Sequence, residues 1–237
     1  MVGIIGAMEK EVQSLEALMA GAESTEIGPF RYVRGMLGGK ETVLLQCGIG
    51  KVNAAIGCAL MLERFAPSWV VNTGSAGGLD PSLTFGDLVV SASALYHDVD
   101  VTAFGYRKGQ IPGSPERFEA DASLIRLAEL SAASLRARGE LPEGVHVVRG
   151  CIGSGDVFVH DGTLIERIRL DFPELTAVEM EGAAIAHACS LFRTPFVIIR
   201  SLSDIAGKES PMKFEEFLPL ASSRSSALVL EMLKGAE

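Results

Sequence analysis

The run PFVIIRS at residues 195–201 decides the class of fold. Its apolar residues follow one another without polar alternation, which is typical of a strand that helices cover on both faces of a sheet. The same pattern predicts further buried strands at Val2–Ile5, Thr42–Cys47, Trp69–Asn72, Asp87–Ser91, Val145–Ile152 and Ala177–Met180. Sheets of this kind bind ligands at the carboxyl ends of their strands, so the residues that follow these runs are the candidates for a site.

Segments with helical spacing separate the predicted strands. In Glu9–Met19 the apolar residues recur every three or four positions. The other predicted helices are Asn53–Phe65, Ser123–Ala137, Gly162–Leu170, Gly182–Leu191 and Phe214–Leu233. This alternation predicts an α/β fold. We expect residues 1–237 to form one domain, because no linker, repeat or low-complexity tract interrupts them. The irregular stretch Tyr96–Glu119 is predicted to be a functional loop.

Composition narrows the class of function. Hydrophobic residues make up 48% of the 237 residues, and the formal net charge is −9. An acidic surface repels phosphate backbones, so nucleic acid is a poor partner. The start of the chain, MVGIIGAME, lacks the basic residues of a signal peptide and the length of a membrane span. We expect four reduced core cysteines in a cytoplasmic protein without a metal site, namely Cys47, Cys58, Cys151 and Cys189.

Two acidic residues stand where α/β enzymes place chemistry. Glu11 opens the first predicted helix and shares a face with Met8 and Leu15, at the edge of the buried stripe. The helix dipole also favours acids in a first turn, so Glu11 has a purely structural alternative. Asp204 follows the strand at 195–201. Its alternative role is to cap the next segment.

Two more carboxylates interrupt the apolar stretch AVEMEGAAIA at 177–186. A buried, ionised carboxylate is unfavourable without a partner, so Glu179 and Glu181 each need one or have a chemical role. An ion pair with Arg200 or Arg149 is the structural alternative, and it suits Glu179 better than Glu181. Glu181 lies at the predicted switch from strand to helix.

Small residues follow two other predicted strands. Asn72–Gly78 (NTGSAGG) is predicted to be a loop whose backbone N–H groups approach a ligand, or else a plain tight turn. It matches neither a dinucleotide fingerprint nor a Walker A loop. In Gly153–Phe158 the aromatic ring suits stacking on a flat ligand, although a core position is equally compatible with the pattern. No Ser lies in a G-x-S-x-G elbow, which disfavours a Ser–His–Asp hydrolase.

Taken in order, these segments closely resemble the 5′-methylthioadenosine/S-adenosylhomocysteine nucleosidases of the purine nucleoside phosphorylase superfamily. The resemblance covers nearly the whole chain and rests on GIIGAMEKEV (3–12), GIGKVNAA (48–55), NTGSAGG (72–78), YHDVDVTAFGY (96–106), SGDVF (154–158), VEMEGAAIAH (178–187) and RSLSD (200–204). It implies a single-domain, mixed and twisted sheet flanked by helices. It also implies a homodimer and hydrolysis of the N-glycosidic bond of methylthioadenosine, adenosylhomocysteine and 5′-deoxyadenosine, without a cofactor or metal.

The resemblance further implies roles for individual residues. Asp204 would protonate N7 of adenine, Glu11 would activate the attacking water, and Glu181 would bind the ribose hydroxyls. Of these acids, we expect Asp204 to stay protonated near neutral pH. The implied substrate contacts are Met8, Ile49, Ser75, Ala76, Phe158 (stacked on adenine), Val159, Met180 and Ser203, with Val101, Phe104, Tyr106 and Pro112 contributed by a partner subunit.

Three alternatives remain open. A phosphorylase needs cations for phosphate, whereas the first turn offers Glu9, Lys10 and Glu11 and the 72–78 segment has no Arg, which favours hydrolysis. A second is a larger adenine nucleoside, such as aminofutalosine, as the substrate of the same chemistry. A third is a nucleoside-binding protein without catalysis, which the joint presence of Glu11, Glu181 and Asp204 disfavours.

Overall fold

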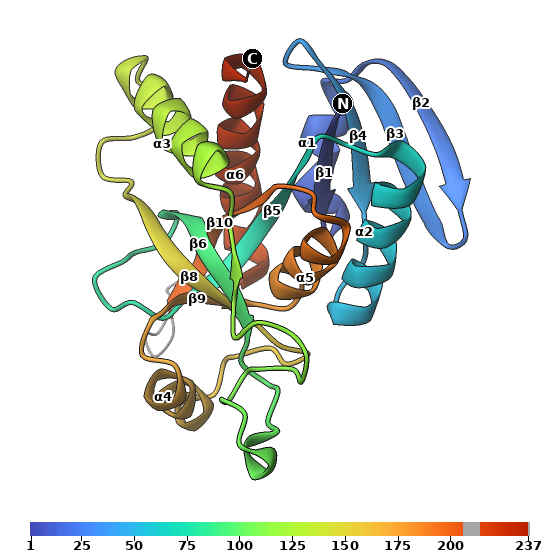
Figure 1. Ribbon diagram of the computed structural model, residues 1–237. Coiled ribbons are helices and arrows are strands. Elements are labelled where there is room, and N and C mark those ends of the chain that lie inside the picture. The colour runs from blue at the N-terminus through green and yellow to red at the C-terminus, as the bar shows by residue number, and fades with distance from the viewer. Residues whose placement is uncertain (206–213, 237) are drawn as a thin grey trace.

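The computed structural model describes residues 1–205 and 214–236, which form a ten-stranded sheet with helices on both sides (Figure 1). The strands are β1 (Val2–Gly6), β2 (Ala20–Ile27), β3 (Phe30–Leu37), β4 (Lys40–Gln46), β5 (Trp69–Gly78), β6 (Leu88–Tyr96), β7 (Phe118–Glu119), β8 (Val147–Ser154), β9 (Leu175–Glu179) and β10 (Phe196–Ile205). The helices are α1 (Glu9–Ala17), α2 (Lys51–Phe65), α3 (Ala122–Ala137), α4 (Gly162–Asp171), α5 (Gly182–Phe192) and α6 (Phe214–Gly235), with a 3₁₀ turn at Thr102–Phe104.

The sheet is mixed, as the resemblance implies. Its strand order is β10-β6-β8-β9-β5-β1-β4-β3-β2, and β5 also pairs with β10. These pairings close β5, β10, β6, β8 and β9 into a ring. The central pairs β1–β4, β1–β5 and β5–β10 are parallel, whereas β5–β9 and β6–β10 are antiparallel. The carboxyl ends of β1, β5 and β10 therefore lie at the same edge of the sheet.

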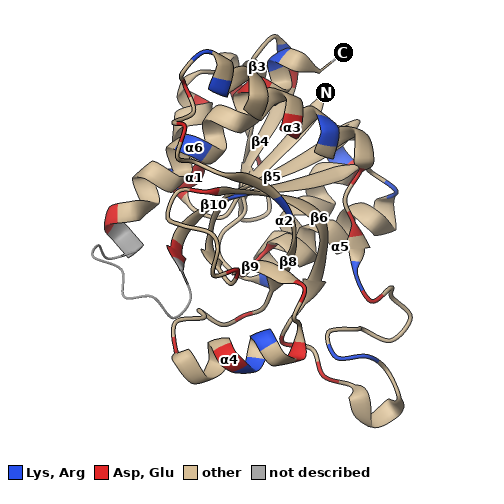
Figure 2. Cartoon of the chain, turned by 90° about the vertical axis from the view of Figure 1, so that its left-hand side faces the viewer, with Lys and Arg blue, Asp and Glu red and all other residues tan. Residues whose placement is uncertain are grey.

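The apolar strands bury both of their faces, as the continuous hydrophobic runs predict. Along β10, Phe196 and Ile198 belong to the same core cluster as residues of α2 and α5, while Val197 and Ile199 belong to the cluster of α1, α3 and α6. A third, smaller cluster lies under α4. Figure 2 shows charged residues mostly on the helices and connecting segments, with the strands largely free of them.

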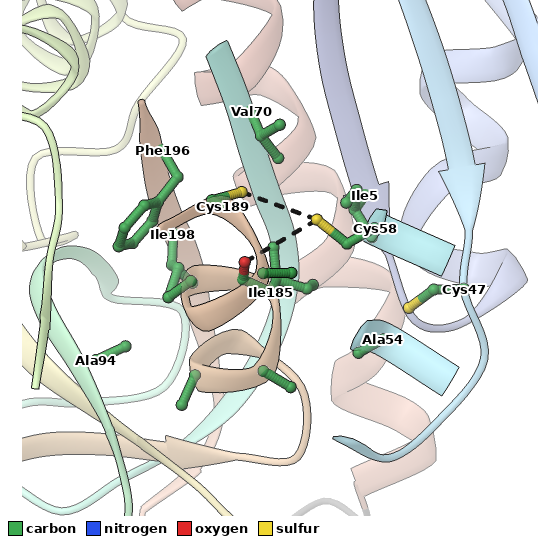
Figure 3. Close-up of a cluster of buried hydrophobic side chains, with 14 of the residues drawn as sticks. Ile5, Cys47, Ala54, Cys58, Val70, Ala94, Ile185, Cys189, Phe196 and Ile198 are labelled. Atoms are coloured by element: carbon green, nitrogen blue, oxygen red, sulfur yellow. Dashed lines mark hydrogen bonds between the residues drawn. The ribbon is translucent and has the colours of Figure 1, made fainter. Parts of the chain in front are cut away.

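The four cysteines are buried free thiols, in agreement with the prediction. Cys58 of α2 faces Cys189 of α5, with the two sulfur atoms 3.8 Å apart (Figure 3). Both side chains belong to the core between these helices and the sheet. They pack there as small apolar residues.

One prediction about the strands is wrong, and one pair of strands was not predicted. The segment Asn72–Gly78 is not a loop, because β5 continues through it to Gly78 and pairs with β10 and β9. Pairing on both sides stabilises an extended backbone that Gly, Ala and Ser do not favour by themselves. The hairpin of β2 and β3 was not predicted, because β2 is exposed along almost its whole length and carries no apolar pattern.

Several strands are longer than predicted. β6 runs to Tyr96, and β10 runs to Ile205, so that Asp204 lies inside the carboxyl-terminal end of a strand. The segment from His97 to Arg117 is irregular apart from the 3₁₀ turn, as expected. Within residues 1–205 and 214–236, none of the helices has the length and apolar character needed to span a membrane.

Candidate active site

A pocket opens where β1, β5, β9 and β10 end, and it brings together most of the residues that the sequence singled out. Its lining residues are Ala7, Met8, Glu11, Ile49, Ser75, Ala76, Gly77, Val157, Phe158, Val159, Val178, Glu179, Met180, Glu181, Ser203 and Asp204. The three acids predicted to be catalytic come from the β1–α1 junction, the β9–α5 junction and β10. Among residues 1–205 and 214–236, no Lys or Arg lines this pocket.

Glu11 is buried, with only 3% of its surface exposed, rather than at the edge of the apolar stripe as predicted. Its Oε2 accepts hydrogen bonds from the backbone N–H groups of Ala7 and Met8, both at 3.0 Å. Its Oε1 accepts from the backbone N–H of Ser75 at 2.9 Å and from Ser75 Oγ at 3.1 Å. The carboxylate therefore caps the first turn of α1, as the structural interpretation predicts, and it also lines the pocket. Its catalytic role stays a prediction.

Glycine in β5 makes room for the carboxylates. A Cβ atom at Gly74 would lie 2.6 Å from Glu11 Oε1, and one at Gly77 would lie 2.9 Å from Asp204 Oδ2. Both distances are shorter than real Cβ contacts. The small residues of the segment 72–78 thus let two acidic side chains lie against the strand, which is the physical reason for their presence.

Glu181 lies at the start of α5 and is 6% exposed. Its Oε1 accepts a hydrogen bond from the backbone N–H of Gly50 at 2.7 Å. Burial, together with the nearby charge of Glu179, raises the pKa of Glu181 from its ordinary 4.5 to about 8. At neutral pH most of the Glu181 side chains therefore carry a proton.

Glu179, two residues earlier, forms a buried ion pair with Arg200, and the distance from Arg200 Nη2 to Glu179 Oε2 is 2.5 Å. Burial opposes the charge, but Arg200 and hydrogen bonds from Ser154 Oγ and the backbone of Gly182 lower the pKa of Glu179 below its usual value. The structural alternative for Glu179 is confirmed, with Arg200 as the partner. Arg149 instead pairs with Glu129.

Asp204 is partly buried beside Ser203, whose hydroxyl donates to Asp204 Oδ1 at 3.0 Å. Burial raises the pKa of Asp204, and the bond from Ser203 opposes this rise. The direction agrees with the expectation of a proton-holding acid, but burial rather than repulsion between carboxylates is the cause. Glu181 shares this property, which the sequence analysis assigned to Asp204 alone.

The segment after β8 forms the apolar wall of the pocket. Phe158 is 53% exposed and its ring stacks on that of His160, with centroids 5.6 Å apart. It is not a core residue, so the alternative interpretation of Phe158 is wrong. Val159 is buried, and Met180 and Ile49 line the same pocket.

Four predicted substrate contacts lie outside this pocket, all in the irregular segment after β6. Phe104 is 80% exposed, Tyr106 is 37% exposed, and Val101 and Pro112 are also at least partly exposed. Within a single chain, these four side chains do not line the pocket. Their assignment to a neighbouring subunit stays a prediction.

Sequence reasoning missed Ala7, Gly77, Val157 and Val178 as lining residues, and the backbone N–H of Gly50 as a partner of Glu181. Gly77 lies in a small-residue segment that had been singled out, and Gly50 has a positive φ of 96°, which favours glycine. Among residues 1–205 and 214–236, no group of His, Cys, Asp and Glu side chains has the arrangement of a metal site.

Comparison with known proteins places this geometry in context. The family model of the phosphorylase superfamily matches residues 1–234. The 5′-methylthioadenosine/S-adenosylhomocysteine nucleosidase of Geobacillus kaustophilus is 54% identical over 230 residues, which are 97% of this chain and 95% of the relative. The solved Neisseria meningitidis nucleosidase of the same name, in complex with methylthio-immucillin-A, superposes with a TM-score of 0.93 at 46% identity, covering 99% of each chain. A futalosine hydrolase mutant of Helicobacter pylori gives a TM-score of 0.90 at 32% identity, again with 99% of each chain covered.

Proposed function

The chain belongs to the phosphorylase superfamily and within it to the 5′-methylthioadenosine/S-adenosylhomocysteine nucleosidases, and from this premise we propose how its pocket performs the reaction. The protein is a hydrolase that cleaves the N-glycosidic bond of 5′-methylthioadenosine and S-adenosylhomocysteine and releases adenine. Breaking this bond leaves negative charge on the departing base and positive charge on the ribose. Three acids at one pocket can serve the two ends of the bond separately.

Asp204 is the acid for the leaving base. Its raised pKa favours a carboxyl group that holds a proton, and Ser203 fixes the orientation of its Oδ1. A proton delivered to N7 of adenine neutralises the charge that develops as the bond breaks. Such a positioned proton transfer contributes about 10²–10⁴ in rate.

Glu11 orients the attacking water. The backbone N–H groups of Ala7, Met8 and Ser75 hold its carboxylate in place, and the hydroxyl of Ser75 donates the fourth hydrogen bond. A carboxylate has about four acceptor positions. A water that is activated by Glu11 therefore displaces the hydroxyl of Ser75, which is the longest and most easily moved of these bonds.

Glu181 serves the ribose. Gly50 holds its Oε1, so Oε2 is the oxygen directed to a sugar hydroxyl. In the protonated form Glu181 donates a hydrogen bond to a ribose hydroxyl. In the ionised form, whose share grows as the pH approaches 8, its negative charge stabilises the cationic sugar. Met180 and Phe158 supply the apolar surfaces against the ribose and the base.

The observation that carries hydrolysis over phosphorolysis is the charge of the pocket. Glu11 occupies the nucleophile side, and within the described part of the chain no Lys or Arg lines the pocket. Phosphate needs cations or clustered N–H donors, and here Glu11 already accepts those of Ala7, Met8 and Ser75. The test is adenine release from 5′-methylthioadenosine in phosphate-free buffer. Turnover that strictly requires added phosphate would overturn the assignment.

Substrate breadth is the second question, because a futalosine hydrolase shares the fold. We propose methylthioadenosine and adenosylhomocysteine as the principal substrates, with 5′-deoxyadenosine accepted, since Ile49 and Met8 offer an apolar surface to a small 5′ group. Catalytic efficiencies measured side by side on these nucleosides and on aminofutalosine decide the order. A higher kcat/KM for aminofutalosine would reverse it.

We further propose a cytoplasmic homodimer that acts in methionine salvage. The four buried free thiols suit a reducing compartment. The exposed side chains of Val101, Phe104, Tyr106 and Pro112 suit a role at the 5′ end of a neighbouring site, as the family resemblance implies. Sedimentation of the purified protein tests the dimer, and a monomer with full activity would contradict it.

A further inference from the structure

Lys51, Asp98 and Asp156 form a hydrogen-bonded group outside the pocket lining, which we name the clamp cluster. Asp98 Oδ2 accepts hydrogen bonds from Lys51 Nζ at 2.6 Å and from the backbone N–H of Asp156 at 2.9 Å. Asp156 Oδ1 accepts from the backbone N–H of Lys51 at 2.8 Å. Lys51 is the first residue of α2, Asp98 follows β6, and Asp156 follows β8. The clamp cluster therefore joins segments that are far apart in the sequence.

Two of the three joined segments carry part of the pocket or its support. Lys51 directly follows Gly50, whose N–H holds Glu181 Oε1 at 2.7 Å. Asp156 directly precedes the segment Val157–Val159, which contains the aromatic wall of the pocket. The clamp cluster thus connects Gly50, which holds Glu181, to the segment Val157–Val159, which is proposed to contact the base.

The packing between these segments leaves little freedom to change their spacing. A Cβ atom at Gly50 would lie 3.1 Å from Asp156 Oδ1, and one at Gly155 would lie 2.5 Å from the Cε1 atom of His97. Burial opposes the charge of Asp98, but the bonds from Lys51 and from the Asp156 backbone hold the pKa of Asp98 below its usual value. Asp98 is therefore an anion at neutral pH, and its bond to Lys51 is charge-assisted.

We propose that Asp98 is a positioning residue. Together with Lys51 and Asp156 it sets the distance between Glu181 and the segment Val157–Val159, which is proposed to bind the base. The inference rests on the proposed function. The binding of a nucleoside depends on this distance, because its base contacts Val157–Val159 and its ribose contacts Glu181. Adenine alone contacts only the segment Val157–Val159. Because misplacement by about 1 Å can reduce a rate on the order of 100-fold, a clamp of this kind contributes to catalysis without touching the substrate.

The test compares a base with a nucleoside. We would measure the affinity of Asp98→Asn and Lys51→Met by calorimetry, for adenine and for the nucleoside analogue methylthio-immucillin-A. We would also measure kcat and KM on 5′-methylthioadenosine. We expect the affinity for the nucleoside analogue and kcat/KM to fall on the order of 10- to 100-fold, while the affinity for adenine stays close to that of the wild type. Lys51→Met keeps the backbone N–H and a similar stem, so the test does not depend on Asp98→Asn folding.

Glu129→Gln is the matched control, because it breaks the exposed Arg149–Glu129 pair, which has the same 2.6 Å distance and lies outside the pocket lining. The proposal is overturned if the folded clamp variants behave like this control. It is also overturned if adenine and the nucleoside lose affinity by the same factor, since that is the mark of a general structural defect. Wild-type protein that binds the analogue but does not hydrolyse methylthioadenosine would instead refute the proposed function and leave the affinity comparison intact.

Discussion

Glu179 and Glu181 lie two residues apart at the junction of β9 and α5, and both are buried, yet their surroundings give them opposite ionisation. Glu179 meets the guanidinium of Arg200, the hydroxyl of Ser154 and backbone N–H groups of α5, and its pKa is lowered. The carboxyl group of Glu181 accepts a hydrogen bond from the backbone N–H of Gly50 but faces no cation comparable to Arg200 among the described residues, and its pKa rises to about 8. The contrast shows that burial alone does not decide the state of a carboxylate. The partner decides, so Glu179 supports the structure, whereas the protonation of Glu181 suits the role proposed for it at the ribose.

The strongest test of this contrast between Glu179 and Glu181 is the effect of a substitution on turnover. Glu181→Gln keeps the shape of the side chain but cannot ionise, so we expect kcat/KM for 5′-methylthioadenosine to fall about 10²–10⁴-fold in a folded protein. Steady-state release of adenine measures it. A variant with wild-type kcat/KM would remove Glu181 from the mechanism.

The next effect is on stability. Glu179→Gln leaves the buried Arg200 without its counter-charge, and we expect the free energy of unfolding to fall by about 3–5 kcal/mol. Urea denaturation measures it. The control Glu129→Gln, at an exposed pair, should lower stability by less than about 1 kcal/mol. Equal losses in the two variants would mean that burial of the Glu179–Arg200 pair has no special consequence.

The pH dependence of stability sharpens the comparison further. Glu181 has a pKa of about 8 in the folded chain and near 4.5 in the unfolded chain, so the unfolded state releases this proton at lower pH. The stability linked to Glu181 is present below pH 4.5 and is lost as the pH rises through 8, on the order of 1.4 kcal/mol for each unit between these values. The variant Glu181→Gln cannot titrate at this position, so its stability does not show this decrease with pH.

The measurement is the free energy of unfolding of wild type and Glu181→Gln at pH 5, 7 and 9. We expect the free energy of unfolding of the variant, relative to that of the wild type, to increase from pH 5 to pH 7 and again from pH 7 to pH 9. A difference that is constant across this range would show that Glu181 titrates normally.

The smallest effect concerns the support around Glu179. Ser154→Ala removes a donor to Glu179 and the acceptor of the backbone N–H of Ala183 at 2.7 Å. We expect a stability loss of about 1–3 kcal/mol, because a buried N–H is left unpaired, and little change in kcat. Arg200 and the backbone N–H of Gly182 should keep Glu179 ionised. A large loss of kcat would instead tie Ser154 to the reaction.

Much of the fold was predictable because its strands are unusually apolar. The runs at β1, β4 and β10 exclude water on both faces, and the intervening amphipathic segments are long enough to be recognised as helices. The hairpin of β2 and β3 was not predictable in this way, since β2 is exposed and its stability comes from pairing with β3. The continuation of β5 through NTGSAGG depends on partners in β9 and β10 that are distant in the sequence.

The candidate site divides in the same manner. By itself, the sequence determined which acids stand beside the ends of buried strands, because hydrophobic runs and their borders are local properties of the chain. Only the tertiary structure decided that Arg200 rather than Arg149 faces Glu179, that Gly50 holds Glu181, and that Lys51, Asp98 and Asp156 meet. The ionisation of a carboxylate depends on charges and donors within a few ångströms, and the chain brings these together from positions as far apart as residues 50 and 181.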